Sequence, residues 1–432
     1  MLVCTTSISL GLYFVNPSKA HFLKATLTPS ENLRFNSDIV ITGSKSETNR
    51  LLLLQALFPN VALNNVSNSD DAQVMQAGLG KTEGEVDIHH AGTAMRFLTA
   101  FFATQAGREV LLTGSPRMKE RPIKVLVEAL QDLGADISYA ANEGYPPLKI
   151  KGNKMTKEWV SLPANISSQY ISALLLNAPH FENGLTLELI GEITSVPYIK
   201  MTLRLLDKIG VKTHFEGNTI QVWPKQGVNT TNMTVESDWS SASYFYSIMA
   251  LAEAGSRISL TAYTQDSLQG DSVLQEIYRF FGVETTFADD TLTLTKKERP
   301  EANTHLELDL VNAPDIAQTI AVSCFALGIS CDLVGLHTLK IKETDRLEAL
   351  QTELSKLGAQ IEVTDKSLHL KPSTKINEGV SIATYHDHRM AMAFAPLAFK
   401  VPLYVEDAMV VSKSYPDFWT DMEKLGLGVV MV

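Results

Sequence analysis

The chain has few cysteines, no long apolar run and no excess of positive charge. Its 432 residues include only Cys4, Cys324 and Cys331, in no metal-type or redox-type spacing, and so sparse a set argues against a disulfide framework. No stretch is long and apolar enough to span a bilayer. The formal net charge of −11 argues against nucleic acid or an anionic membrane as a partner.

The first 20 residues lack the pattern of a signal peptide. No basic residue precedes Lys19, and hydroxyl residues between Thr5 and Ser9 interrupt the apolar ones. A signal peptide has a positively charged start and an uninterrupted apolar run. We therefore expect Met1–Ala20 to be an extension or a first strand, and the protein to be cytoplasmic.

An internal repeat indicates how the chain is organised. A chain of this length exceeds one core of typical size. Four amphipathic helical patterns each end at a glycine before a short alternating strand, and subtraction of the residue numbers gives intervals of 76, 72 and 76 residues between Gly134, Gly210, Gly282 and Gly358. A further copy ends at Gly426, and a clipped first copy lies around Val74–Gly80. About six units fill the chain, which predicts α/β subdomains grouped three and three.

Several short motifs place polar side chains at expected helix starts. Residues 43–50 read GSKSETNR and precede an apolar run, without the spacing of a Walker loop. Residues 90–96 read HAGTAMR, in which Gly92 permits close approach of a ligand to the backbone. Ser167-Ser168-Gln169 offers hydroxyls and an amide. Each of these could equally be an ordinary capped helix start.

The charged motifs are denser. Arg121 lies in a loop between two prolines, where it could bind a carboxylate or phosphate. Residues 342–346 read KETDR, and Asp387-His388-Arg389 leads directly into a nearly uncharged helix. Surface ion pairs are the alternative for both clusters. Because buried charges need partners, a ligand site is favoured, and the motifs together supply Lys45, Arg50, Arg121, Lys342, Arg346, Arg389 and Lys413. Composition and spacing thus indicate a cleft enzyme that acts on small phosphorylated anions.

The motifs resemble those of the EPSP synthase family, in the same order, from about Gly43 to Trp419. They include GSKSETNR, HAGTAMRF, GSPRMKERPI, SSQYISALL, SVPYIKMTL, SDWSSASYF, SLQGD, APDIAQTIA, IKETDRL, TYHDHRMAMAF and SKSYPDF. The resemblance implies a two-domain inside-out α/β barrel of six repeated helix–strand subunits, the enolpyruvyl transferase fold. It implies crossovers near Thr42 and Asp238, which gives a discontinuous domain of residues 1–42 and 238–432 and a second domain of residues 43–237.

The resemblance also implies an activity. The enolpyruvyl (1-carboxyvinyl) group of phosphoenolpyruvate would move to the 5-hydroxyl of shikimate 3-phosphate, with release of phosphate, in the shikimate pathway of chorismate and aromatic amino acid biosynthesis. Asp315 would accept the hydroxyl proton, Glu343 would donate to the methylene carbon, and Lys45 would assist both substrates. No metal or organic cofactor is implied, and we expect a monomer with small-molecule substrates.

The same resemblance implies two sets of binding residues. Shikimate 3-phosphate would contact Lys45, Ser46, Arg50, Ser167, Ser168, Gln169, Ser195, Tyr198, Asp315, Thr338 and Lys342. Phosphoenolpyruvate would contact Lys45, Gly92, Arg121, Gln169, Arg346, Arg389 and Lys413.

The chain departs from the family pattern at a few positions. His90, Thr338 and His386 stand where asparagine is frequent, Phe97 where proline often follows the arginine, and the unit around Val74–Asp87 is shortened. Three rival functions are less consistent with the residues. Transfer to UDP-N-acetylglucosamine typically comes with a cysteine in the loop matching Thr113–Lys124, which has none. A non-catalytic anion-binding protein would be expected to lose Asp315, Glu343 or Lys45, and an RNA-terminal phosphate cyclase does not suit the charge of −11.

Overall fold

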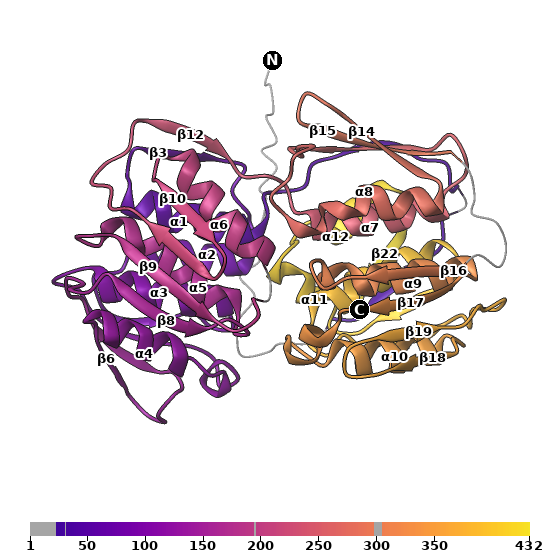
Figure 1. Cartoon of the computed structure of the whole chain (residues 1–432). Helices are drawn as coiled ribbons and strands as arrows, with labels where there is room; N and C mark the ends of the chain where they lie inside the picture. The colour runs from indigo at the N-terminus through magenta and orange to yellow at the C-terminus, as the bar shows by residue number, and fades with distance from the viewer. Residues whose placement is uncertain (1–22, 31, 194–195, 298–304) are drawn as a thin grey trace, which may run out of the picture.

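The computed structural model describes residues 23–30, 32–193, 196–297 and 305–432. The expected N-terminal extension or strand at Met1–Ala20 and the site residue Ser195 lie outside this part of the chain. Figure 1 shows two lobes side by side, one built from the middle of the sequence and the other from its two ends.

Each lobe has its own apolar core. The terminal lobe packs buried residues from 25–41 and 239–427 into one cluster, and the central lobe packs buried residues from 51–235 into another. The chain crosses between the lobes twice at one place, where Gly43 bridges Ser237 and the Ser44 amide donates to the Glu236 carbonyl at 2.8 Å. We propose that the two lobes are the predicted domains, with boundaries at residues 42/43 and 237/238; the two cores support this division.

One structural unit recurs around both cores. A strand leads into a buried helix and then into a second strand parallel to the first, after which an outer helix and an antiparallel hairpin complete a four-stranded sheet. The unit is seen whole in the terminal lobe as β16 (His305–Asp309), α9 (Ala317–Leu327), β17 (Ser330–Val334), α10 (Arg346–Lys356), β18 (Ile361–Val363) and β19 (Leu368–Leu370).

Two whole copies lie in the central lobe. The first is β4 (Glu83–Asp87), α3 (Gly92–Thr104), β5 (Glu109–Thr113), α4 (Lys124–Leu133), β6 (Asp136–Tyr139) and β7 (Leu148–Lys151). The second is β8 (Trp159–Pro163), α5 (Ser168–Asn177), β9 (Leu185–Ile190), α6 (Val196–Lys208), β10 (Thr213–Glu216) and β11 (Thr219–Val222).

Two further copies in the terminal lobe borrow a strand from the start of the chain. One joins β2 (Asn36–Ile39) to α7 (Trp239–Leu251), β13 (Arg257–Thr261), α8 (Leu274–Ile277), β14 (Val283–Ala288) and β15 (Thr291–Lys296). The other joins β1 (Ala25–Thr28) to β20 (Val380–Ile382), α11 (His388–Phe394), β21 (Leu403–Val405), α12 (Phe418–Lys424) and β22 (Gly428–Met431).

The sixth copy is incomplete, as the sequence predicts. It consists of α1 (Lys45–Leu57), β3 (Val61–Asn64), α2 (Asp70–Leu79) and β12 (Thr231–Thr234), and its sheet has two strands only. Five of the repeat glycines have a positive φ, from 72° to 109°, but Gly80, in the clipped copy, has a φ of −75°. The helix expected before Gly282 is broken into short 3-10 segments around α8.

The first helix of each unit is the buried one. In α7 every residue except Ser240 is buried, and α9 and α3 are nearly as enclosed. These helices carry few charges along their length because a buried charge without a partner is costly. Their charged and polar side chains lie instead near their first turns, at Lys45, Asp315 and Arg389 among others.

Candidate active site

A single buried arginine holds three carboxylates of the terminal lobe. Arg346, the first residue of α10, is 1% exposed. Its Nε donates to Asp387 Oδ2 at 2.6 Å, its Nη1 to Asp315 Oδ1 at 2.8 Å, and its Nη2 to Glu343 Oε2 at 2.8 Å. The KETDR and DHR motifs, 41 residues apart, therefore meet Asp315 at one guanidinium.

The surrounding cations set the charge of the two proposed acid–base residues. Burial alone would raise the pKa of Asp315, but Lys342, Arg389 and Arg346 together hold it well below the usual range. Lys342 Nζ lies 3.3 Å from Asp315 Oδ1, and Arg389 Nη2 lies 3.5 Å from Asp315 Oδ2. The Glu343 side chain is 36% exposed. Its partial desolvation likewise favours the neutral form, but nearby cations, Arg346 foremost, keep the pKa of Glu343 well below normal. Both carboxyls are therefore ionised in this structure.

Arg389 is positioned by residues that sequence analysis did not assign to the site. Asp387 caps α11 by accepting from the Arg389 amide at 2.9 Å. The Arg389 guanidinium donates to Ser240 Oγ at 3.1 Å, and Ser240 in turn makes a short hydrogen bond to Asp271. Burial and the charge of Asp315 raise the pKa of Asp271 to about 6. Ser240 and Asp271 belong to the motifs SDWSSASYF and SLQGD, so the motifs could have identified them.

Lys45 joins the site from the central lobe. It is the first residue of α1, and its Nζ lies 3.3 Å from Asp71 Oδ2. Burial lowers the pKa of Lys45, but Asp71 and Glu343 more than offset burial and leave it raised. The ammonium is therefore charged, and part of this effect comes from Glu343 of the terminal lobe. Asp71 is a residue that the sequence analysis did not assign.

Arg50 lies deeper in the central lobe, and its hydrogen-bond acceptors are neutral. Its guanidinium donates to Thr202 Oγ1 at 2.9 Å, to Ser172 Oγ at 3.1 Å and to the Ser46 carbonyl at 2.7 Å. The Phe97 ring lies 5.5 Å from Arg50 Cζ. Burial lowers the pKa of Arg50 to about 10, so the group stays charged at neutral pH. Such a charge is suited to an incoming anion.

Other predicted residues of the central lobe begin α3 and α5. Ser167 accepts from the Gln169 amide at 3.4 Å, Ser168 starts α5, and Gln169 Nε2 donates to Thr93 Oγ1 at 3.2 Å. The serine–glutamine motif and the start of α3 therefore lie side by side. A Cβ added to Gly92 would lie 2.5 Å from Arg121 Nη1, which places that guanidinium directly against the Gly92 backbone.

Three further predicted site residues are Tyr198, Thr338 and Lys413. Tyr198 bridges the lobes, because its hydroxyl donates to Asp315 Oδ2 at 3.4 Å. Thr338 Oγ1 is buried and has no hydrogen-bond partner among the described residues. Lys413 Nζ donates to the His386 carbonyl at 2.8 Å. Lys413 also lies near His90, because after burial its charge is the next largest influence lowering the His90 pKa.

His388 is the clearest residue that the sequence analysis left without a role. It is 3% exposed, and its Nδ1 has no hydrogen-bond partner among the described residues. Burial, together with the charges of Lys45, Arg389 and Arg346, holds the His388 pKa well below its usual range despite Glu343. The imidazole is therefore neutral, and its Nδ1 lies 3.7 Å from Asp387 Oδ1.

A comparison with known protein families identifies the family of the chain that carries this cluster of charged residues. The family model described as EPSP synthase (3-phosphoshikimate 1-carboxyvinyltransferase) matches residues 77–422. The chain belongs to the EPSP synthase family.

Individual relatives of this family agree with the match. A 3-phosphoshikimate 1-carboxyvinyltransferase of Bacteroides fragilis (strain YCH46) is 42% identical over 400 residues, which cover 92% of this chain and 97% of the relative. One from Haemophilus influenzae (strain PittEE) is 35% identical over 440 residues, with 94% and 99% covered. The solved EPSP synthase from Acinetobacter baumannii superimposes with a TM-score of 0.80 at 21% identity, covering 95% of this chain and all of that one. The predicted fold class is thus confirmed.

Proposed function

We propose that this EPSP synthase family member transfers the carboxyvinyl group of phosphoenolpyruvate to the 5-hydroxyl of shikimate 3-phosphate and releases phosphate. The observation that carries the proposal is that two carboxylates, the buried Asp315 and the partly exposed Glu343, meet on the Arg346 guanidinium, and that Glu343 also helps to keep Lys45 charged. Such a transfer needs a base at the attacking hydroxyl and an acid at the vinyl carbon, among cations that stabilise two polyanions.

Asp315 is proposed as the base. Its carboxylate is ionised, as a proton acceptor must be, and Lys342 and the Tyr198 hydroxyl contact its two oxygens. When Asp315 accepts the 5-hydroxyl proton, the oxygen of shikimate 3-phosphate attacks the central carbon of phosphoenolpyruvate. The same proton can later pass to the departing phosphate.

Glu343 is proposed as the acid, and this role requires substrate. Without ligand, Glu343 is ionised because cations offset the effect of burial on its pKa. The carboxylate and phosphate of phosphoenolpyruvate would neutralise Arg346 and Lys45, and the ligand would cover the exposed part of the Glu343 side chain. Desolvation would then dominate and raise the pKa of Glu343. Protonated Glu343 then donates to the methylene carbon, giving a methyl group and a tetrahedral intermediate. Loss of phosphate returns one methyl proton to Glu343 and restores the vinyl group.

The remaining predicted residues are proposed to bind the two substrates. Arg50 has neutral partners, and the Thr338 hydroxyl has no hydrogen-bond partner within the described part of the chain; both support a place for shikimate 3-phosphate beside them. The contact of Arg121 with Gly92, and the position of Lys413 near His90, support a phosphoenolpyruvate pocket at the start of α3. Ser195 keeps its proposed role from the family resemblance alone.

A coupled phosphate-release assay tests this function. We expect phosphate to appear only when both phosphoenolpyruvate and shikimate 3-phosphate are present, and the rate to be unchanged by EDTA, because protein cations supply the charge. Equal activity with UDP-N-acetylglucosamine would refute the proposal. So would a loss of activity in EDTA that added metal restores.

We also propose that the protein works as a monomer in the cytoplasm. No helix in the described part of the chain is long and apolar enough to cross a membrane. Cys324 and Cys331 are both buried free thiols, which suits a reducing compartment.

A further inference from the structure

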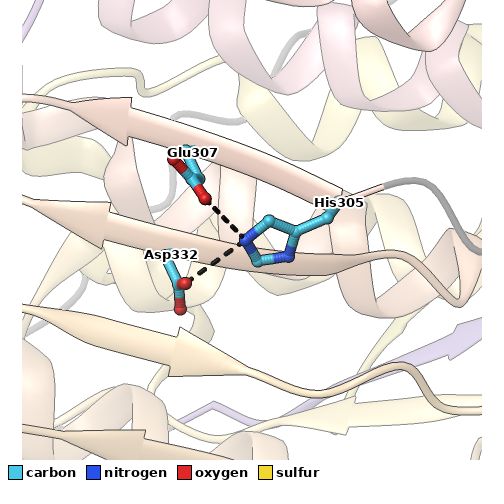
Figure 2. A group of neighbouring side chains, drawn as sticks. All are labelled: His305, Glu307 and Asp332. Carbon is cyan, nitrogen blue, oxygen red and sulfur yellow. Dashed lines mark ion pairs between the residues drawn. The ribbon is translucent and has the colours of Figure 1, made fainter.

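We propose that His305, Glu307 and Asp332 form a binding site for a divalent transition metal such as Zn²⁺ on the outer face of the β16–β17 sheet. Figure 2 shows the three side chains converging, with His305 between the two carboxylates. The sequence analysis expected no metal for the reaction, and this site contains none of the residues proposed for catalysis or substrate binding.

Strand register brings the three residues together. β16 and β17 are parallel, with His305 opposite Ser330 and Glu307 opposite Asp332. Alternate residues of a strand share a face, so His305 and Glu307 project to the same side. Cys331 faces the other way and is fully buried. β16 is the edge strand of its sheet and pairs with β17. A metal ion bound by residues of both strands would therefore link the edge strand to its neighbour.

The spacing of the ligand atoms suits a small tetrahedral ion. His305 Nε2 lies 3.2 Å from Asp332 Oδ2 and 3.6 Å from Glu307 Oε1, and all three atoms lie within 4.8 Å of one another. Zinc binds nitrogen and oxygen at about 2.0–2.2 Å, which in a tetrahedron separates the ligand atoms by about 3.3–3.6 Å. Two carboxylates also balance the charge of a divalent cation, and solvent can fill the fourth position.

Neighbouring side chains hold two of the three ligands in the required orientation. His305 Nδ1 lies 2.8 Å from Ser330 Oγ, so donation to that hydroxyl leaves the Nε2 lone pair directed at the carboxylates. His369 Nδ1 lies 2.6 Å from Asp332 Oδ1, the oxygen that does not face His305. Ser367 Oγ in turn lies 2.9 Å from His369 Nε2. Outer partners of this kind orient metal ligands and tune their affinity.

The central lobe supplies a matched control for this arrangement. His214 and Glu216 on β10 repeat the His-x-Glu spacing, with His214 Nε2 3.3 Å from Glu216 Oε2. The two residues form one exposed ion pair with each other, and neither is part of a three-ligand group among the residues that the structure describes. An ordinary surface His–Glu pair is therefore available in the same molecule.

Calorimetric titration of the chelator-stripped full-length protein with Zn²⁺ tests the proposal. We expect one Zn²⁺ per chain, a melting temperature that rises with Zn²⁺, and tetrahedral absorption bands when Co²⁺ is used instead. His305→Ala should lower the affinity by at least tenfold. His369→Ala should lower it by about tenfold, as removal of an outer partner does, while His214→Ala should leave it unchanged.

Three outcomes would overturn the site. The first is no Zn²⁺ binding by the wild type, which would leave only a cluster of ion pairs. The second is equal affinity in the wild type and His305→Ala, and the third is an equal loss in His214→Ala. The turnover number should be the same with and without bound Zn²⁺, so failure of this proposal leaves the proposed reaction untouched.

Discussion

Glu343 is the residue whose proposed role depends most on its surroundings. Glu343→Gln keeps the size of the side chain but removes the proton that the vinyl carbon needs. We expect kcat to fall by about 10²–10⁴-fold, the usual contribution of general acid–base catalysis. The affinity for shikimate 3-phosphate should change little, because Arg50 and Lys342 remain. Steady-state kinetics and a binding titration measure both quantities.

A matched control lies on the following helix. Glu348 is exposed in the first turn of α10, and Glu348→Gln should leave kcat unchanged. Near-normal kcat in Glu343→Gln would contradict the proposed acid and would transfer the donor role to Lys45, whose ammonium carries a proton.

Gly92 allows Arg121 to lie against the helix start. A methyl group at this position would come within 2.5 Å of Arg121 Nη1, the far end of a flexible side chain. The guanidinium can move aside, so Gly92→Ala should fold normally but misplace the arginine. Overpacking of this kind costs about 1–3 kcal/mol. A loss of about 1.4 kcal/mol in binding free energy weakens binding tenfold. We therefore expect KM for phosphoenolpyruvate to rise by about tenfold with an unchanged melting temperature. A lower melting temperature with equal losses for both substrates would make Gly92 a structural residue only.

Glu47 provides a test of pH dependence away from the chemistry. It is 2% exposed, and burial together with Glu236 raises its pKa from 4.5 to about 7. A carboxyl with a raised folded-state pKa destabilises the fold when it ionises, so stability is lost as the pH rises from about 4.5 through 7. This pKa shift corresponds to a loss of about 3 kcal/mol in the free energy of unfolding above pH 7. Glu47→Gln should therefore raise the melting temperature at pH 8 and change it little at pH 5. An equal effect at both pH values would contradict this.

The charged residues that meet in the structure were named from their motifs, and their roles stay predictions, whereas the partners of these residues were not assigned from the sequence. Lys45, Arg346 and Arg389 lie in motifs whose residue types already indicate anion binding. Asp71 and Ser240 hold those cations in place, yet an isolated aspartate or serine at a helix start also serves as an ordinary cap. In the structure the caps of these two helices are Ser69 and Asp238, and only the fold shows that Asp71 and Ser240 contact the cations of the site.

At the scale of elements, Asp387 connects the starts of two helices, because it caps α11 and binds Arg346, the first residue of α10. It is fully buried, caps α11 through the Arg389 amide and accepts from Arg346 at 2.6 Å. Asp387→Ala would remove one partner of a buried ion pair, which typically costs about 3–5 kcal/mol. We expect a large fall in the free energy of unfolding, measured by denaturant titration. Asp365, which contacts Lys340 at 2.8 Å on the surface, is the control, and Asp365→Ala should change stability little. Equal effects of the two variants would contradict the account of the Arg346 cluster.

The repeated units show what local sequence can and cannot specify. Helices that end at Gly134, Gly210, Gly358 and Gly426 were predicted because a left-handed glycine is a local signal. The segment before Gly282 ends at a left-handed glycine as predicted, but it forms short helical segments and not the continuous helix that was expected. Strand β1 pairs with β21 and β22, nearly the whole chain away, and no local pattern specifies such a partner.

At the scale of the molecule, the two lobes touch through polar contacts across the site and through Leu268 of the terminal lobe, which packs against the central core. Besides the Tyr198–Asp315 contact, Asn68 donates to Asp417 at 2.8 Å and Ser412 donates to Asp70 at 2.7 Å. The two apolar clusters remain separate. Individual hydrogen bonds contribute only about 0.5–1.5 kcal/mol each, so the lobes can part at modest cost and a ligand that contacts both should hold them closed.

Small-angle scattering tests this closure. Shikimate 3-phosphate is proposed to contact Arg50 in the central lobe and Lys342 in the terminal lobe, so it should draw the lobes together. We expect the radius of gyration to fall on saturation with this ligand. An unchanged value at saturating ligand would mean that the site does not assemble by movement of the lobes.

The central claim is that transfer proceeds by protonation of the vinyl carbon, attack by the 5-hydroxyl and loss of phosphate. Proton and phosphorus NMR of the wild-type enzyme with both substrates in D₂O measures this directly. We expect inorganic phosphate together with a new vinyl ether in which deuterium has entered the methylene group, because a methyl group forms and then loses one of its three hydrogens. No phosphate release, or release with a methylene group free of deuterium, would contradict it.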